Sequence, residues 1–129
     1  MHILITDDLF TSRFQTGLVL KSMGFSFDEA SNGDEAIELI IKRDYDLVLM
    51  DIEMPVRNGI ETIGYIRNKI SGYKRDVKVV VLTAHNPVDY FRKFKDAGFD
   101  GMASKPLDKN KISNILKELN ILKKPCGKP

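Results

Sequence analysis

The chain has 129 residues, of which 43% are hydrophobic and 29% charged, proportions typical of one soluble globular domain with its own core. Its 20 basic and 18 acidic side chains leave a net charge of +2, so direct binding to nucleic acid is not expected, and the lone Cys126 excludes a disulfide framework. No apolar run reaches the roughly 20 residues that span a bilayer, and the first residues do not resemble a signal peptide, so we expect a cytoplasmic protein without membrane insertion.

The first half of the chain alternates strand-like and helix-like segments. Predicted strands lie at 2–6, 25–30 and 46–50, and residues 47–50 of the last form an unbroken apolar run typical of a strand covered on both faces. Predicted helices lie at 10–23 and after a turn or cap at 31–34. Their apolar residues recur near helical spacing, at Phe10, Phe14, Leu18 and Met23 in the first, and at Ala36, Ile37, Ile40 and Ile41, which we expect to be buried, in the second. Gly24 is expected to end the first helix.

The second half continues the alternation. Strands are predicted at 77–82 and 101–104. Helices are predicted at 59–70, from Asn86-Pro87 to Ala97-Gly98, and from Leu107-Asp108 onwards, with a polar connection at 71–76. Five strands alternating with five helices predict an α/β fold, a doubly wound parallel sheet covered on both faces. We expect one domain over 1–122 and a mobile tail at 123–129.

Polar side chains stand at the ends of four predicted strands. Asp7 and Asp8 follow the first strand, Asp51 the third, Thr83 the fourth and Lys105 the fifth. The carboxyl ends of parallel strands share one edge of a sheet, where such folds bind ligands. Three carboxylates placed together repel one another unless cations lie among them, and Lys105 supplies only one positive charge. A divalent ion such as Mg²⁺ would supply the rest, so the pattern predicts a carboxylate nucleophile, a metal and a phosphoryl group.

These motifs resemble those of the receiver domains of two-component response regulators, and the resemblance extends over residues 2–122. The matching segments are Ile-Thr-Asp-Asp (5–8), Leu-Met-Asp-Ile-Glu-Met-Pro with Asn-Gly (49–55 and 58–59), Leu-Thr-Ala (82–84) and Ser-Lys-Pro (104–106). The amino-acid sequences of these motifs most resemble those of the receiver domains of hybrid histidine kinases. The resemblance implies a flavodoxin-like fold with the strand order 2-1-3-4-5.

The resemblance also implies a metal-assisted phosphorylation site. Asp51 would accept a phosphoryl group from a phosphohistidine of a histidine kinase or histidine phosphotransfer protein. Asp8 would bind Mg²⁺ or Mn²⁺ directly and Asp7 through water, while Asp51 and the backbone carbonyl of Glu53 would complete the protein ligands. Such a domain is no enzyme beyond catalysing its own phosphoryl transfer and slow autodephosphorylation.

Three further residues have roles implied by the same resemblance. Thr83 and Lys105 would bind the phosphoryl oxygens, with a cis bond to Pro106 shaping the lysine loop. Family members usually carry Tyr or Phe where this chain has Met102, so the aromatic part of the switch is replaced by a flexible apolar side chain. The output surface is expected to include Met102 and Tyr90. No DNA-binding or catalytic output segment is visible, so we expect the output to go through a downstream protein partner.

Three other readings compete with a phosphorylated receiver. A phosphatase of the haloacid-dehalogenase kind would need Asp-x-Asp-x-Thr at the nucleophile, whereas Glu53 and Pro55 follow Asp51 here. A flavodoxin would need a phosphate-binding loop after the first strand, where Asp7 and Asp8 would repel a bare phosphate. A receiver-like module that docks a partner without phosphorylation stays open, although the five key side chains are present.

Overall fold

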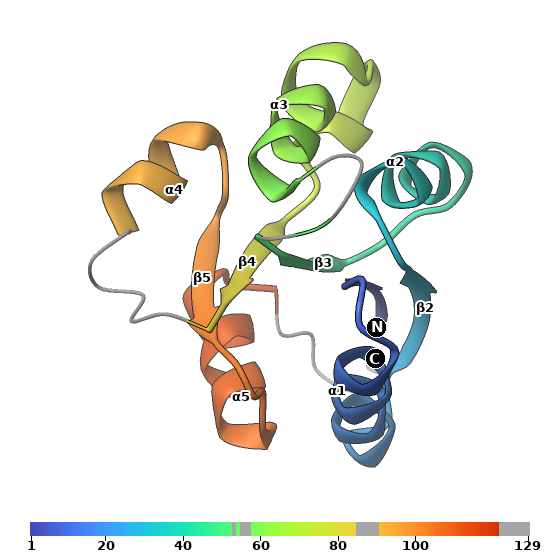
Figure 1. Cartoon of the computed structure of the whole chain (residues 1–129), viewed down its shortest axis with the longest axis vertical. Coiled ribbons are helices and arrows are strands. Elements are labelled where there is room, and N and C mark those ends of the chain that lie inside the picture. Colours follow the sequence, from blue (N-terminus) through green and yellow to red (C-terminus); the bar gives the residue numbers. More distant parts are fainter. Residues whose placement is uncertain (53, 55–57, 85–90, 122–129) are drawn as a thin grey trace.

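A five-stranded parallel sheet in the order β2-β1-β3-β4-β5 forms the centre of the molecule (Figure 1). The computed structural model describes residues 1–52, 54, 58–84 and 91–121, with backbone only at 91–93. The strands are β1 (His2–Thr6), β2 (Ser26–Ala30), β3 (Leu47–Asp51), β4 (Val79–Thr83) and β5 (Gly101–Ser104). The α/β class, the doubly wound sheet and the strand order expected from the sequence are confirmed.

Helices cover both faces of the sheet. They are α1 (Phe10–Ser22), α2 (Gly33–Lys42), α3 (Gly59–Lys69), α4 (Phe91–Ala97) and α5 (Lys109–Glu118). Figure 1 shows α2, α3 and α4 on one face and α1 and α5 on the other. Asn32, Asn58 and Asp108 cap α2, α3 and α5, each accepting from a backbone N–H of the first turn. No helix in the described part of the chain has the length and apolar character that crossing a membrane requires. The start of α4 predicted at 86–87 lies outside the described residues.

The central strand β3 is buried on both sides. Leu47 and Leu49 belong to the apolar layer under α1 and α5, while Val48 and Met50 belong to the layer under α2, α3 and α4. All four side chains are inaccessible to solvent. Successive strand residues point to opposite faces, so a strand between two helix layers is apolar throughout. Asp51 therefore ends a strand that is fixed from both sides.

The apolar residues that recur at helical spacing in α1 face solvent and not the core. Phe10 is 66% exposed, Phe14 55% and Leu18 53%. In α2, Ile41 was predicted to be buried, but its side chain is 52% exposed. The inner face of α1 instead carries Gly17 and Leu20. A Cβ on Gly17 would lie 2.8 Å from Cζ of Phe27, so this helix approaches the sheet where glycine leaves room for an aromatic ring.

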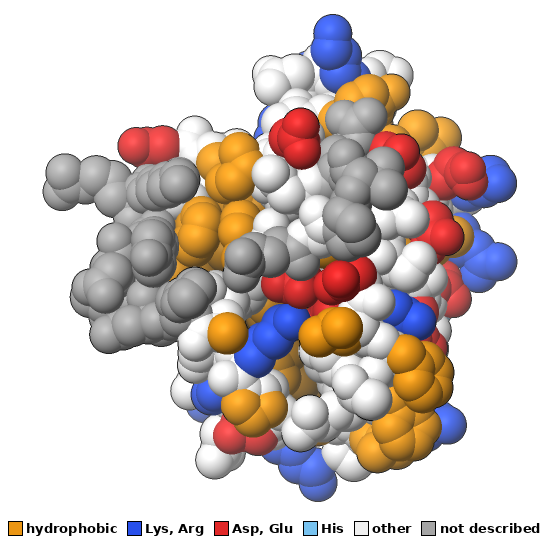
Figure 2. Space-filling view, in the orientation of Figure 1, with side chains coloured by type: hydrophobic (Ala, Val, Ile, Leu, Met, Phe, Trp, Pro, Cys, Tyr) orange, Lys and Arg blue, Asp and Glu red, His pale blue; other side chains and the backbone are white. Residues whose placement is uncertain are grey.

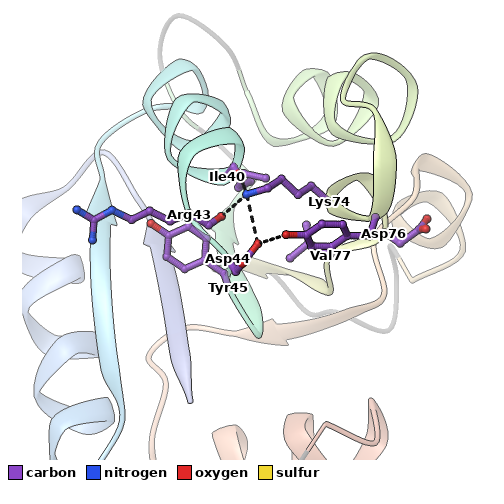
Figure 3. A pocket seen from close by; sticks show the side chains of 8 residues that line it. Ile40, Arg43, Asp44, Tyr45, Lys74, Asp76 and Val77 are labelled. Carbon is purple, nitrogen blue, oxygen red and sulfur yellow. Dashed lines mark hydrogen bonds and ion pairs between the residues drawn. The ribbon is translucent and has the colours of Figure 1, made fainter.

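Residues 71–76, predicted as a polar connection, contain the short 3₁₀ helix η1 (Gly72–Asp76). Lys74 within it donates from Nζ to the backbone carbonyls of Ile40 and Arg43, both at 2.9 Å, and forms an ion pair with Asp44 at 3.3 Å (Figure 3). The lysine thereby satisfies carbonyl groups at the carboxyl end of α2. Backbone partners leave no sequence signature, which is why this contact was not foreseen.

Candidate functional site

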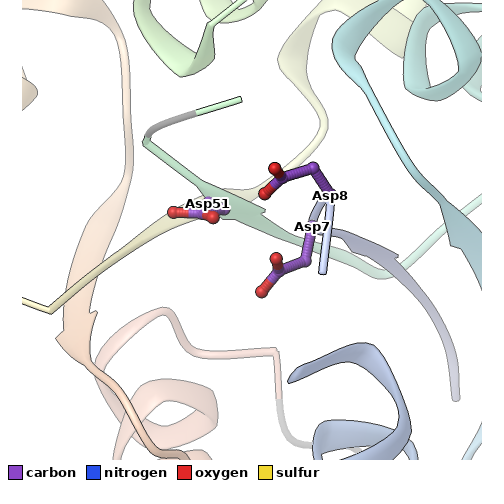
Figure 4. A group of neighbouring side chains, drawn as sticks. All are labelled: Asp7, Asp8 and Asp51. Atoms are coloured by element: carbon purple, nitrogen blue, oxygen red, sulfur yellow. The ribbon is translucent and has the colours of Figure 1, made fainter. Parts of the chain in front are cut away.

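Three carboxylates meet at the carboxyl edge of the sheet. Asp7 and Asp8 directly follow β1, and Asp51 is the last residue of β3, which pairs with β1 (Figure 4). One oxygen from each carboxylate lies within 4.8 Å of the others. The structure thus brings together the three acidic residues that the strand-end pattern singled out.

Asp7 is the most enclosed of the three carboxylates, with a side chain only 2% exposed. Its Oδ1 accepts the backbone N–H of Leu9 at 3.0 Å, and its Oδ2 accepts from Lys105 Nζ at 2.8 Å and from the Ser12 hydroxyl at 2.5 Å. Burial alone would raise the pKa of Asp7, but the hydrogen bonds from Lys105, Ser12 and Leu9 together hold it below its ordinary value. Asp7 is therefore a carboxylate at neutral pH.

Lys105 bridges two of the carboxylates. Its Nζ lies 2.8 Å from Oδ2 of Asp7 and 3.1 Å from Oδ2 of Asp51. Burial works to lower the pKa of Lys105, but the bonds to Asp7 and Asp51 raise it above its ordinary value, so the ammonium stays charged. Counted formally, three aspartates at −1 each and one lysine at +1 give these four side chains a charge of −2.

The unbalanced charge and the clustered oxygens fit a divalent cation. Asp8 is exposed, and within the described residues its side chain forms no hydrogen bond or ion pair. Asp51 is mostly buried but offers an oxygen close to those of Asp7 and Asp8. Hard ions such as Mg²⁺ prefer such a set, in which a few carboxylates share the coordination shell with water. Glu53, whose carbonyl was expected to take part, lies outside the described residues.

The ends of β4 and β5 complete this edge. Thr83 is the buried last residue of β4, and its carbonyl accepts the backbone N–H of Lys105 at 2.9 Å. The Lys105–Pro106 peptide bond is cis, the isomer that the resemblance implied. Thr83 ends β4 and Lys105 directly follows the neighbouring strand β5, so both lie at the same edge as the carboxylates.

Met102, at the position usually aromatic in the family, lies in β5. Its partly buried side chain packs against the apolar layer under α2, α3 and α4. Together with Phe94 and Phe99 it lines a shallow crevice beside α4. Tyr90, the other residue expected in the output surface, lies outside the described residues.

Sequence reasoning missed two residues of α1, Ser12 and Arg13, that contact the end of β1. Ser12 bonds the carboxylate of Asp7, and Arg13 donates from Nη1 to the backbone carbonyl of Asp7 at 2.7 Å and from Nε to Glu29 at 3.0 Å. A serine in a first helical turn is usually read as part of a cap. Its five-residue distance from Asp7 was the available signal, because the first turn of a helix that follows a strand end lies over that end.

The acidic edge adjoins the exposed apolar stripe of α1. Figure 2 shows acidic side chains near the middle of this face with a basic group beside them, and a hydrophobic patch over α1. The patch is made by Leu9, Phe10, Phe14 and Leu18, all more than half exposed. Most large apolar side chains of a globular domain are buried, so a continuous exposed stripe of this kind is a candidate interaction surface.

Comparisons with known proteins agree with this geometry. A family model described as response regulator receiver domain matches residues 3–117. The chain is 32% identical to the chemotaxis protein CheY of Halobacterium salinarum, over 92% of this chain and 95% of that protein. It is 30% identical to sporulation initiation phosphotransferase F of Bacillus subtilis, over 94% of both. The response regulator TrrA of Thermotoga maritima, solved in complex with Mg²⁺-BeF, superposes with a TM-score of 0.78 at 32% identity, over 94% of this chain and 98% of that one.

Proposed function

The chain belongs to the response regulator receiver domain family, and from this premise we propose that Asp51 accepts a phosphoryl group from a phosphohistidine in a two-component or phosphorelay pathway. One observation carries the proposal. The carboxylate that ends the central strand lies 3.1 Å from the ammonium of Lys105 and within 4.8 Å of two further carboxylates. The match to this family argues against the two alternative functions, a haloacid-dehalogenase-type phosphatase and a flavodoxin.

The transfer needs little from the protein besides position and charge. An oxygen of Asp51 attacks phosphorus, the P–N bond of the phosphohistidine breaks, and its electron pair returns to the imidazole nitrogen, which takes up a proton. The transition state of such a transfer is loose and carries its charge on the phosphoryl oxygens. Lys105 is placed to neutralise part of that charge, and the Thr83 hydroxyl would donate to a phosphoryl oxygen.

A Mg²⁺ or Mn²⁺ ion is part of the proposal. Asp8 and Asp51 would bind it directly, Asp7 would hold it through water, and Glu53 would add its carbonyl. When bound, the ion would offset carboxylate charge and polarise the phosphoryl oxygens. The solved relative TrrA was obtained with Mg²⁺-BeF, and the relative from Bacillus subtilis is named a phosphotransferase, which support both parts of this assignment.

Phosphorylation would be reported through β4 and β5. A doubly negative group on Asp51 attracts Thr83 and Lys105 through charge-assisted hydrogen bonds. Met102, packed beside Phe94 and Phe99, can follow by changing rotamers, because its side chain has three rotatable bonds. We expect a modest population shift and an output surface on α4, β5 and α5 that also includes Tyr90, read by a downstream protein.

The protein that donates the phosphoryl group must reach Asp51 from outside. The apolar stripe of α1 begins with Leu9, two residues beyond Asp7, and runs along the helix past Phe14 to Leu18. A partner helix lying on this stripe would be next to the acidic edge, so we assign the stripe to the histidine kinase or histidine phosphotransfer protein.

Intact-mass spectrometry tests the proposed function. The chain is incubated with acetyl phosphate in the presence of Mg²⁺ or of EDTA. We expect the mass of one phosphoryl group to be added with Mg²⁺ and not with EDTA. A chain that gains no mass under either condition would instead be a docking module that works without phosphorylation.

A further inference from the structure

We propose that Ser12 is a positioning residue, whose hydroxyl fixes the orientation of the Asp7 carboxylate at the site that would hold Mg²⁺. This inference rests on the proposed function, since it concerns the metal of the same site. The carrying observation is the 2.5 Å hydrogen bond from the Ser12 hydroxyl to Oδ2 of Asp7. Ser12 is half-buried in the first turn of α1, so a helix anchored to the sheet presents this donor to the strand end.

The three hydrogen bonds to Asp7 are distributed unequally over its two carboxylate oxygens. Ser12 and Lys105 both donate to Oδ2, while Oδ1 receives, from the residues that the structure describes, only the backbone N–H of Leu9 at 3.0 Å. A carboxylate oxygen accepts two or more bonds, so Oδ1 keeps capacity for a metal-bound water. The side chain is otherwise enclosed, and its orientation is set by these three contacts.

The bond from Lys105 to Asp7 is expected to weaken during the reaction. It also bonds Asp51, where the phosphoryl group would be formed, and the new negative charge attracts its ammonium. Once Lys105 turns to the phosphoryl group, the Ser12 hydroxyl is the remaining side-chain donor among the contacts described for Asp7. Ser12 would therefore hold Oδ2 of Asp7 in both states, while the backbone N–H of Leu9 holds Oδ1.

Partners of a group that faces a metal tune its affinity, and their loss typically weakens binding about 10-fold or more. We expect Ser12→Ala to weaken Mg²⁺ binding by about that lower figure. Ser12→Thr keeps the hydroxyl and should bind Mg²⁺ like the wild type. Thr11→Ala is the matched control, because Thr11 is an exposed hydroxyl residue of the same turn.

The experiment measures the melting temperature of the full chain against MgCl₂ concentration, with isothermal titration of MgCl₂ as the direct reading. A purely structural role for Ser12 would lower the melting temperature equally at every Mg²⁺ concentration and leave the dissociation constant for Mg²⁺ unchanged. The proposal requires that dissociation constant, and the Mg²⁺ concentration at which the melting temperature begins to rise, to increase in Ser12→Ala and to return in Ser12→Thr. If Ser12→Ala does not fold, Ser12→Cys, a near-isosteric weak donor, must show the same increase.

The outcomes separate the inference from the function on which it rests. Equal dissociation constants for the wild type and Ser12→Ala, with Mg²⁺ bound by both, overturn the role of Ser12 and leave the receiver function intact. A wild type without any saturable response to Mg²⁺ overturns the metal site, and the role of Ser12 with it.

Discussion

Two lysines at opposite edges of the sheet are equally exposed but bind different kinds of partner. Lys105 and Lys74 both have side chains that are 21% exposed. At the carboxyl edge, Lys105 bonds two carboxylates in a cluster that remains negative. At the amino edge, Lys74 bonds two backbone carbonyls and one carboxylate, which completes the end of α2. Polar groups left with excess charge are available for chemistry, whereas matched ones stabilise the fold.

The amino edge shows the same matching around His2. Asp28 accepts from the Tyr45 hydroxyl at 2.8 Å and from His2 Nε2 at 2.9 Å, and the rings of His2 and Tyr45 are stacked. Asp46 accepts the backbone N–H of His2 at 2.8 Å. We therefore expect substitutions at the amino edge to change stability and those at the carboxyl edge to change phosphorylation.

Exchanging each lysine for methionine should give the largest contrast. Lys105→Met removes the cation that faces the phosphoryl oxygens, and we expect phosphorylation by acetyl phosphate to slow by about 100-fold, as when one charge-stabilising donor is lost elsewhere. Lys74→Met should leave that rate unchanged and lower the free energy of unfolding by about 1–2 kcal/mol, because charged hydrogen bonds to the end of α2 are lost. Phosphorylation kinetics and urea unfolding check both. Similar rates for the two variants would abolish the distinction between the edges.

Metal should stabilise the carboxyl edge alone. Binding to the folded state adds about 2.7 kcal/mol when Mg²⁺ exceeds its dissociation constant 100-fold. Asp8→Asn removes an expected direct ligand, so the melting temperature should no longer rise with Mg²⁺, and relief of repulsion should raise it in EDTA. Asp7→Ala should reduce the metal effect less completely. A wild type that melts at the same temperature in EDTA and in millimolar Mg²⁺ would contradict the assignment.

Two exposed aromatic side chains sharpen the contrast for partner binding. Phe14 lies in the stripe of α1 and is 55% exposed, while Tyr73 at the amino edge is 71% exposed. Phe14→Ala should slow transfer from a phosphorylated histidine phosphotransfer protein by about 10-fold, the cost of losing one interface anchor. Transfer from phosphoramidate, which needs no docking, should be unchanged, and Tyr73→Ala should affect neither. An equal loss with both donors would place Phe14 in the fold rather than in the interface.

The smallest effect concerns Asp28 and its dependence on pH. Burial raises the pKa of Asp28, but the hydrogen bonds from Tyr45 and His2 outweigh it and lower the pKa. Its charge thus stabilises the fold above the ordinary aspartate pKa of about 3.9, and this stabilisation is lost as the pH falls through the lower folded-state pKa. Asp28→Asn should cost about 1 kcal/mol near neutral pH and progressively less in acid. Urea unfolding across pH checks it, with the exposed Asp76→Asn as control; a constant difference would refute it.

The sequence predicted the sheet and the clustered residues well because both depend on local patterns. Apolar runs such as 47–50 end on polar side chains, and parallel strands bring those ends together. Ser12, in contrast, acts through a contact five residues away, and Lys74 acts through carbonyl groups that every residue carries. The stripe of α1 was predicted as helical, but spacing does not show which face a helix turns to the sheet. In α1, the face that packs on the sheet is the one that carries Gly17, where the missing side chain leaves room for the ring of Phe27.

The central claim is that Asp51, among the three clustered carboxylates, is the phosphoacceptor. Borohydride reduces an aspartyl phosphate to homoserine, so peptide mapping by mass spectrometry after reaction with acetyl phosphate and Mg²⁺ identifies the residue. The account predicts homoserine at position 51, unmodified Asp7 and Asp8, and no phosphate uptake by Asp51→Asn. Homoserine at Asp7 or Asp8, or an acid-stable, base-labile phosphate that persists in Asp51→Asn, would contradict it.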